Sequence, residues 1–107
     1  MGDFMFETSD ENELKKKIAK GTVVALFYAS WCHDSRAFLP VCDAHAKKAK
    51  CEVIKVRIDE EENPIWDDFK IEFVPTVIRF ENGKEKKRAA HGNGHYLTAD
   101  DMVALSR

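Results

Sequence analysis

Cysteine is scarce in this sequence, and its scarcity excludes one class of protein. The chain has three cysteines, an odd number at irregular spacing, so at least one thiol stays free and no disulfide framework is expected. Small secreted domains usually depend on such a framework. The start of the chain also lacks the basic segment and apolar run that mark a secretory signal. We therefore expect a cytoplasmic protein in a reducing compartment.

Long apolar runs and an excess of one charge are also missing. No stretch approaches the roughly 20 apolar residues that cross a bilayer. The formal net charge is −2, and acidic residues interleave with the lysine clusters. These features exclude a membrane and nucleic acid as expected partners. The 107 residues, of which 44% are hydrophobic and 34% charged, predict one domain spanning residues 1–107 and a monomer.

The most informative stretch is an apolar run that ends at a cysteine. Residues 22–28 follow a glycine, are rich in Val and Phe, and predict a buried strand. A helical pattern containing Pro40 begins at Cys32 and extends to about Lys50. Cys32 is therefore expected at a helix N-terminus, where unpaired N–H groups and the helix dipole favour a negative charge. This placement favours the thiolate, which is the nucleophile. The alternative is an inert buried thiol.

The remaining elements alternate between strands and helices. Further strands are predicted at residues 4–7, 52–58, 76–81 and 84–90. Further helices are predicted after a capping box at Thr8–Glu11, after Asn63-Pro64, and after Thr98 with Asp101 three residues on. Asn82-Gly83 predicts a tight hairpin turn. This order predicts an α/β fold with a parallel core sheet and an antiparallel edge.

Apolar spacing predicts which helix faces are buried. In the first helix, Leu14 and Ile18 are expected to face the core, and Gly21 is placed to end it. The helix that begins at Cys32 carries a narrow apolar stripe of Ala37, Val41 and Ala44. The apolar side of the last helix is expected to consist of three residues, Met102, Val103 and Leu105.

The chain resembles the thioredoxin family over nearly its whole length. The resemblance rests on several motifs in order and at family spacing: Phe27-Tyr28-Ala29-Ser30-Trp31-Cys32, Pro40, Ile58-Asp59, Phe69-Lys70-Ile71-Glu72-Phe73-Val74-Pro75-Thr76, Phe80-Glu81-Asn82-Gly83 and Gly92. It implies the thioredoxin fold, a central mixed sheet of about five strands flanked by four helices. It also implies thiol–disulfide exchange without a cofactor or metal, on protein disulfide or thiol substrates.

The resemblance implies a substrate-binding surface around Cys32. Pro75 would be the family's cis-proline beside the active sulfur, and the backbone of Val74 would pair with the bound substrate chain. Gly92 would match the glycine that flanks the same groove, and Trp31 would form part of its rim. His33 and Asp34, which follow Cys32, would also face the substrate.

The sequence departs from the family motif W-C-x-x-C because Ser35 replaces the second cysteine. Without a resolving thiol, a mixed disulfide at Cys32 should persist until an outside thiol attacks it. Cys42 lies ten residues further on, about 15 Å along a helix, whereas a disulfide needs Cα atoms within about 7 Å. The Ser35 hydroxyl would either donate to the Cys32 thiolate or simply face solvent.

Other departures concern the charges near Cys32. The family often has a buried aspartate below the site, where this chain has Leu26; the family's neighbouring lysine is matched by Lys55. A protonated His33 would favour the thiolate and Asp34 would disfavour it, so their net effect stays open. No Cys or His spacing predicts a metal site. The other histidines, His45, His91 and His95, are expected at the surface.

Three functions fit these features. The first is thiol–disulfide exchange by an oxidoreductase or isomerase in which Cys32 is the nucleophile and Ser35 assists, with glutathione or a reductase supplying the external thiol. The second is a redox-inactive module that binds partners on the same surface. The third is an engineered Cys-to-Ser form of a dithiol thioredoxin.

Overall fold

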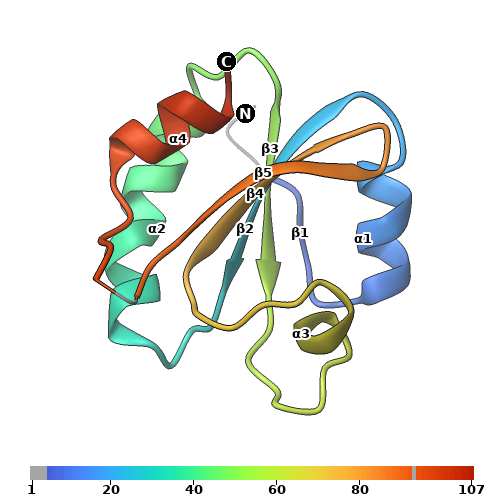
Figure 1. Cartoon of the computed structure of the whole chain (residues 1–107), viewed down its shortest axis with the longest axis vertical. Helices are drawn as coiled ribbons and strands as arrows, with labels where there is room; N and C mark the ends of the chain where they lie inside the picture. The colour runs from blue at the N-terminus through green and yellow to red at the C-terminus, as the bar shows by residue number, and fades with distance from the viewer. Residues whose placement is uncertain (1–4, 93) are drawn as a thin grey trace.

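A five-stranded mixed sheet forms the centre of the molecule (Figure 1). The computed structural model describes residues 5–92 and 94–107. The strand order is β1-β3-β2-β4-β5, with β1, β3 and β2 parallel and β4 and β5 antiparallel to their neighbours. The bounds are β1 Glu7–Thr8, β2 Thr22–Tyr28, β3 Glu52–Arg57, β4 Thr76–Glu81 and β5 Lys84–Ala90. The predicted strands 22–28, 76–81 and 84–90 are confirmed.

Four helices cover the two faces of the sheet: α1 Glu11–Ile18, α2 His33–Ala46, α3 Ile65–Asp68 and α4 Ala99–Leu105. Figure 1 shows α2 and α4 on one side of the sheet and α1 and α3 on the other. The side chains of β2 alternate between the two cores, with Phe27 in the α1 core and Leu26 and Tyr28 in the α2 core. The predicted α/β fold of about five strands and four helices is confirmed.

The first strand and helix begin later than predicted. β1 consists of Glu7 and Thr8, whereas residue 4 of the predicted strand lies outside the described residues. The N-cap of α1 is Asp10, whose carboxylate accepts from the Glu13 backbone N–H at 2.9 Å. Thr8 therefore does not cap α1; its hydroxyl donates to the Glu13 carboxylate instead. An aspartate is as good an N-cap as threonine, so Asp10 can start the helix in place of Thr8.

The buried face of α2 differs from the predicted stripe. Ala37 and Ala44 are exposed, while Ser35, Phe38 and Cys42 face the sheet. Burying the Phe38 ring removes far more apolar surface from water than burying an alanine, so the face that carries Phe38 turns inward. The helix ends at Ala46, earlier than Lys50. In α4, Val103 is likewise 42% exposed, and only Met102 and Leu105 of the predicted trio are buried.

The hairpin turn and the last helix cap match their predictions. Asn82 and Gly83 both have positive φ, 53° and 86°, as a type I′ turn requires. The backbone N–H of Thr98 donates to the Asp101 carboxylate at 2.8 Å, which completes the capping box of α4.

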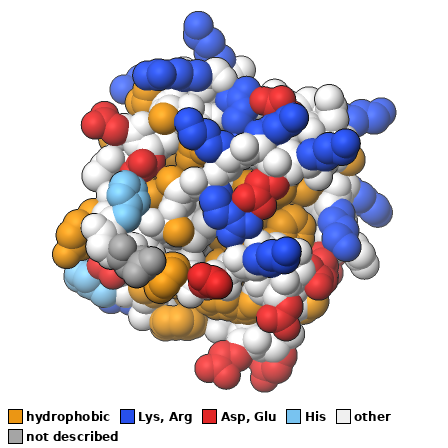
Figure 2. All heavy atoms as spheres, viewed as in Figure 1, with side chains coloured by type: hydrophobic (Ala, Val, Ile, Leu, Met, Phe, Trp, Pro, Cys, Tyr) orange, Lys and Arg blue, Asp and Glu red, His pale blue; other side chains and the backbone are white. Residues whose placement is uncertain are grey.

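Figure 2 shows lysine and arginine side chains interleaved with acids over the face that contains β5.

The topology brings four chain segments to one edge of the sheet. β2 and β3 run parallel, so the residues after Tyr28 and after Arg57 leave the sheet at the same edge. β4 runs the opposite way and starts there, since Thr76 pairs with Phe27. β5 ends there, since Ala90 pairs with Thr76. Residues 29–32, 58–59, 73–75 and 91–92 therefore meet, although they are far apart in the sequence.

Candidate active site

Cys32 lies where β2 gives way to α2. It is the N-cap residue of α2, with φ −91° and ψ 125°, and its side chain is partly exposed. The Cys32 carbonyl accepts the backbone N–H of Arg36 at 3.0 Å, which begins the helical bonding. The placement of Cys32 at a strand-to-helix junction is as predicted. Here the helix dipole and the unpaired N–H groups of the first turn favour a negatively charged sulfur.

The Cys32 sulfur contacts the segment that enters β4. The thiol donates a hydrogen bond to the Val74 carbonyl oxygen at 3.8 Å. The peptide bond between Val74 and Pro75 is cis. The Pro75 carbonyl accepts the backbone N–H of His91 at 2.9 Å, so the segment after β5 is tied to the same place. Cys32 thus lies against the segment that leads into β4.

The surface around the sulfur carries exposed apolar groups. We call the exposed surface formed by Trp31, Cys32, Phe73, Val74 and Gly92 the thiol face. Trp31 is 58% exposed and Phe73 is 40% exposed, which is unusual for side chains of this size in a small fold. An apolar segment of a partner protein would bury these rings on binding.

Gly92 allows the thiol face to pack closely. Its φ is +123°, and a Cβ built there would lie 2.8 Å from the Phe73 ring. Residues that carry a side chain rarely adopt this backbone conformation. Only glycine therefore fits between Phe73 and the segment after β5.

Gly92→Ala is expected to lower the free energy of unfolding by about 2–4 kcal/mol, because backbone strain adds to the clash with Phe73. Urea denaturation measures the change. Gly94→Ala is the matched control, since Gly94 also has a positive φ, +87°, but among the described residues no atom beyond its chain neighbours lies within 4 Å of its added Cβ. Equal losses in the two variants would show that the contact with Phe73 contributes nothing.

Ser35 lies under the site and not in solvent. Its side chain is 0% exposed, and its Oγ accepts the Ala29 backbone N–H at 3.3 Å. No hydrogen bond joins Ser35 to Cys32 in the described part of the chain, so neither predicted state of the hydroxyl is seen. The reason is that Ser35 faces the end of β2, where the Ala29 N–H needs a partner.

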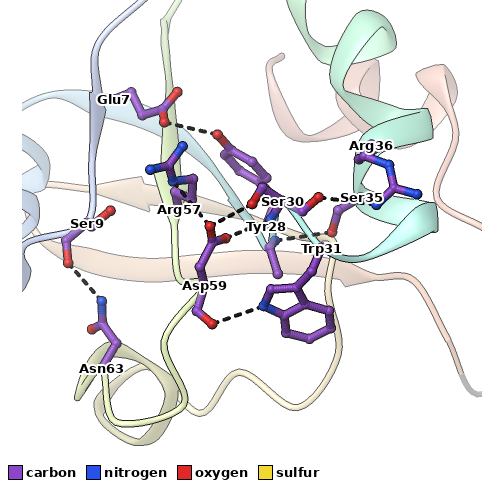
Figure 3. Close-up of polar contacts among 11 residues, drawn as sticks. Glu7, Ser9, Tyr28, Ser30, Trp31, Ser35, Arg36, Arg57, Asp59 and Asn63 are labelled. Atoms are coloured by element: carbon purple, nitrogen blue, oxygen red, sulfur yellow. Dashed lines mark hydrogen bonds and ion pairs between the residues drawn. The ribbon is translucent and has the colours of Figure 1, made fainter.

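Asp59 holds the loop before Cys32, a role that sequence reasoning missed (Figure 3). Its carboxylate accepts two hydrogen bonds from Ser30, from the backbone N–H at 2.7 Å and from the hydroxyl at 2.6 Å. Its backbone carbonyl accepts the Trp31 indole N–H at 3.0 Å, and Arg57 lies 3.5 Å from the carboxylate. The available signal was an acid placed just after a parallel strand, at the edge where loops meet.

The charge on Asp59 should stabilise the fold above about pH 4. Partial burial would raise the pKa of this carboxyl, but the hydrogen bonds from Ser30 and the charge of Arg57 together lower it below its usual value. A group with a lowered pKa contributes stability above its unfolded pKa of about 3.9, and the contribution is lost as the pH falls through the folded value.

Asp59→Asn should therefore cost about 1 kcal/mol of unfolding free energy at pH 7, a modest figure because solvent screens a partly exposed carboxylate. The difference in unfolding free energy between the variant and the wild type should shrink as the pH falls below about 4, and should vanish once the pH is below the lowered pKa of folded Asp59, where its carboxyl is protonated. Urea unfolding from pH 3 to pH 7 measures it. A difference in unfolding free energy that does not change with pH would mean that the charge of Asp59 does not contribute to stability.

His91 is the second residue whose place was not predicted. It was expected at the surface, but its side chain is only 16% exposed, and its Nε2 lies 3.3 Å from the Asp34 carboxylate. Its Nδ1 accepts the Leu97 backbone N–H at 3.2 Å. His45 is also partly buried against Ser106, whereas His95 is exposed as expected. His91 thus links the first turn of α2 to the segment after β5.

His33, by contrast, is exposed, and within residues 5–92 and 94–107 its side chain makes no hydrogen bond or ion pair. Lys55 is drawn away from Cys32, because it pairs with Asp43 at 3.4 Å and Glu7 at 3.8 Å. Leu26 is fully buried in the α2 core. No carboxylate therefore lies at position 26 to accept a proton below the sulfur.

The other two cysteines lie away from the site, with Cys42 on α2 and Cys51 immediately before β3. Each of the three cysteines carries a free thiol. Cys42 is fully buried, and desolvation, with a smaller contribution from Asp43, raises the pKa of its thiol to about 12 despite the opposing charge of Lys55. Cys51 is partly exposed and donates to the Ser106 carbonyl at 3.8 Å. At neutral pH the Cys42 thiol stays protonated and unreactive.

The residues that the structure describes contain neither a membrane-spanning helix nor a metal-binding cluster. No helix in that part of the chain is long and apolar enough to cross a bilayer. In the same residues, no three His, Cys, Asp or Glu side chains are grouped so that they could hold a metal ion.

Comparison with known proteins gives consistent matches. The thioredoxin family model matches residues 5–103. A thioredoxin of Rickettsia felis is 32% identical over 71% of this chain and 75% of its own length, and one of Chlamydia trachomatis is 30% identical over 79% and 83%. Among solved structures, a point mutant of a thioredoxin from Halobacterium salinarum superposes with a TM-score of 0.77 at 23% identity, over 97% of this chain and 88% of that one. This last match shows a shared fold.

Proposed function

The chain belongs to the thioredoxin family of thiol–disulfide oxidoreductases, and we propose that it works through one nucleophilic sulfur, that of Cys32. An external thiol completes each exchange. The observation that carries this proposal is the partly exposed Cys32 sulfur at the start of α2, with fully buried Ser35 in place of a second thiol. Substrates are protein disulfides or thiols, and glutathione or a reductase supplies the external thiol.

The proposed reaction has two displacements. In the first, the Cys32 thiolate attacks one sulfur of a substrate disulfide, a Cys32–substrate disulfide forms, and the other sulfur leaves as a thiolate that takes a proton from water. In the second, the thiolate of an external thiol attacks the substrate sulfur and releases Cys32 as a thiolate. One disulfide is consumed and one is formed, so the protein returns to its starting state.

The geometry supports a reaction in which Cys32 is the nucleophile and a thiol from outside the chain completes the exchange. Cys32 is held against Val74 and Pro75, whose exposed neighbours Phe73 and Trp31 offer apolar contacts to a substrate chain. Cys42 cannot complete the reaction from within, because it lies about 15 Å along the helix from Cys32 and stays protonated. A reaction that depends on an external thiol suits a thiol-rich reducing compartment, and we propose a cytoplasmic monomer.

Mass spectrometry after reaction with a peptide disulfide tests the proposal. We expect one peptide to be added per protein, mapped to Cys32, with Cys42 unmodified and providing an internal control. The Cys51→Ser variant should give the same adduct. No adduct at neutral pH under these conditions, or an adduct mapped to Cys51, would reject exchange at Cys32. Partner binding that survives alkylation of Cys32 would then favour a binding module.

A further inference from the structure

We propose that Asp34 makes the thiol face select disulfides whose attacked cysteine is flanked by a basic residue. The inference rests on the proposed exchange at Cys32 and names its substrate class. Three observations carry it: the place of Asp34 in the first turn after Cys32, the carboxylate oxygen that the described chain leaves without a partner, and the exposed aromatic ring beside His91.

Asp34 closes a ring of contacts around the sulfur. Its carboxylate meets the His91 side chain, and the His91 backbone N–H donates to the Pro75 carbonyl. The next residue, Gly92, packs on Phe73, and Val74 accepts the Cys32 thiol. Asp34 is also two residues after Cys32 in the first turn of α2. These contacts place the Asp34 carboxylate on the side of the thiol face that Gly92 borders.

The described chain engages one oxygen of the Asp34 carboxylate, through the His91 side chain. The Leu97 N–H donates to Nδ1 of His91, so Nδ1 carries no proton and Nε2 carries the one that points at Asp34. In this form the imidazole is uncharged and holds one carboxylate oxygen without neutralising it. The Asp34 side chain is 52% exposed, and its Oδ1 makes no hydrogen bond to the rest of the described chain. That oxygen is open to a cation.

The surroundings of Asp34 favour a cation over an anion. The Tyr96 ring lies 5.3 Å from the His91 ring and is 75% exposed, which offers a face for a lysine or arginine side chain. Figure 2 shows apolar and histidine side chains together at the left of the molecule, beside the connection from β5 to α4. Arg36, a cation close by on α2, donates to the Ser30 carbonyl on the Trp31 side.

The test uses symmetric peptide disulfides that differ only in the residues flanking the cysteine: lysine, glutamine or glutamate. The second-order rate of adduct formation at Cys32 is measured at low salt for each peptide. For the wild type we expect the lysine peptide to react about 3- to 10-fold faster than the glutamate peptide, the size expected for one partly exposed charge pair. Added salt should reduce this ratio.

Three variants separate Asp34 from general charge effects. Asp34→Asn keeps an oxygen for the His91 N–H but removes the charge, so the ratio should fall toward one, and Asp34→Lys should invert it. Asp68→Asn, an exposed acid on α3, makes the same change in net charge and should leave the ratio unchanged. Any effect of Asp34 on the reactivity of the Cys32 thiolate changes the rates of all peptides by the same factor, so it cancels in the ratio of the lysine-peptide rate to the glutamate-peptide rate.

The outcomes also separate this inference from the proposed function. A wild-type ratio near one, or an Asp34→Asn ratio equal to that of the wild type, would overturn the selection by Asp34 while exchange at Cys32 stands. A failure of every peptide to form an adduct would instead reject the exchange reaction itself, and this inference with it.

Discussion

Cys32→Ser is expected to lower the rate of disulfide exchange by about 10³-fold or more, to the uncatalysed level. The Cys32 sulfur is the only protein atom in the proposed reaction that forms a covalent bond to the substrate, and removing a nucleophile abolishes the steps that depend on it. A loss of folding would not explain the result. Cys32 is the N-cap of α2 and its side chain makes no capping hydrogen bond, whereas serine is a preferred N-cap residue. The variant should be at least as stable as the wild type.

The matched control is Cys51→Ser. The Cys51 thiol donates to the Ser106 carbonyl, and a serine hydroxyl keeps a donor at this position. We expect its exchange rate to stay within about twofold of the wild type, since a surface thiol outside the reaction contributes little. Turnover of a disulfide substrate by both variants, with urea unfolding alongside, makes the comparison. Retained activity in Cys32→Ser would mean that another thiol is the nucleophile.

Ser35→Cys is expected to shorten the life of the mixed disulfide at Cys32 by about 10³-fold. A second thiol three residues along the first turn of α2 would compete with the external thiol. Even an effective concentration of about 1 M, far below the best intramolecular values, exceeds about 1 mM of external thiol by that factor. The reaction would change from exchange to net dithiol reduction, and the protein would accumulate an internal disulfide. The substituted side chain would cost about 1 kcal/mol, because the Ala29 N–H loses its hydroxyl acceptor.

Ser35→Ala separates the added thiol from the lost hydroxyl. This variant also loses the bond to Ala29 but gains no nucleophile, so its mixed disulfide should last as long as that of the wild type. Acid quenching followed by mass measurement gives both lifetimes and detects the loss of two hydrogens in Ser35→Cys. A mixed disulfide in Ser35→Cys that lasts as long as in Ser35→Ala would show that positions 32 and 35 cannot meet.

The sheet could be predicted from the sequence because its signals are local. The apolar run 22–28 is buried on both faces, and Asn82-Gly83 marks the turn between two strands, so the bounds of β2, β4 and β5 came out as expected. The buried face of α2 was harder to predict, because two stripes compete on that helix. The larger Phe38 decides between them, and its burial depends on the sheet below.

The contacts that shape the site could not be predicted in the same way. Asp59 meets Ser30 across 29 residues of sequence, and His91 meets Asp34 across a still longer separation. Neither pair shows a periodic or motif signal, since each forms only when separate strands deliver their loops to one edge of the sheet. The resemblance implied that Pro75 lies beside the active sulfur and that Val74 pairs with the substrate, because those motifs occur at family spacing. It carried no information about His91.

The most direct test of the account is the decay of a purified mixed disulfide at Cys32 in the wild-type protein, measured at increasing concentrations of reduced glutathione. The account predicts that the adduct persists without added thiol and decays at a rate proportional to the glutathione concentration, because no thiol within the chain reaches the bond. A decay rate that does not depend on glutathione, with release of the peptide and formation of an internal disulfide, would contradict it.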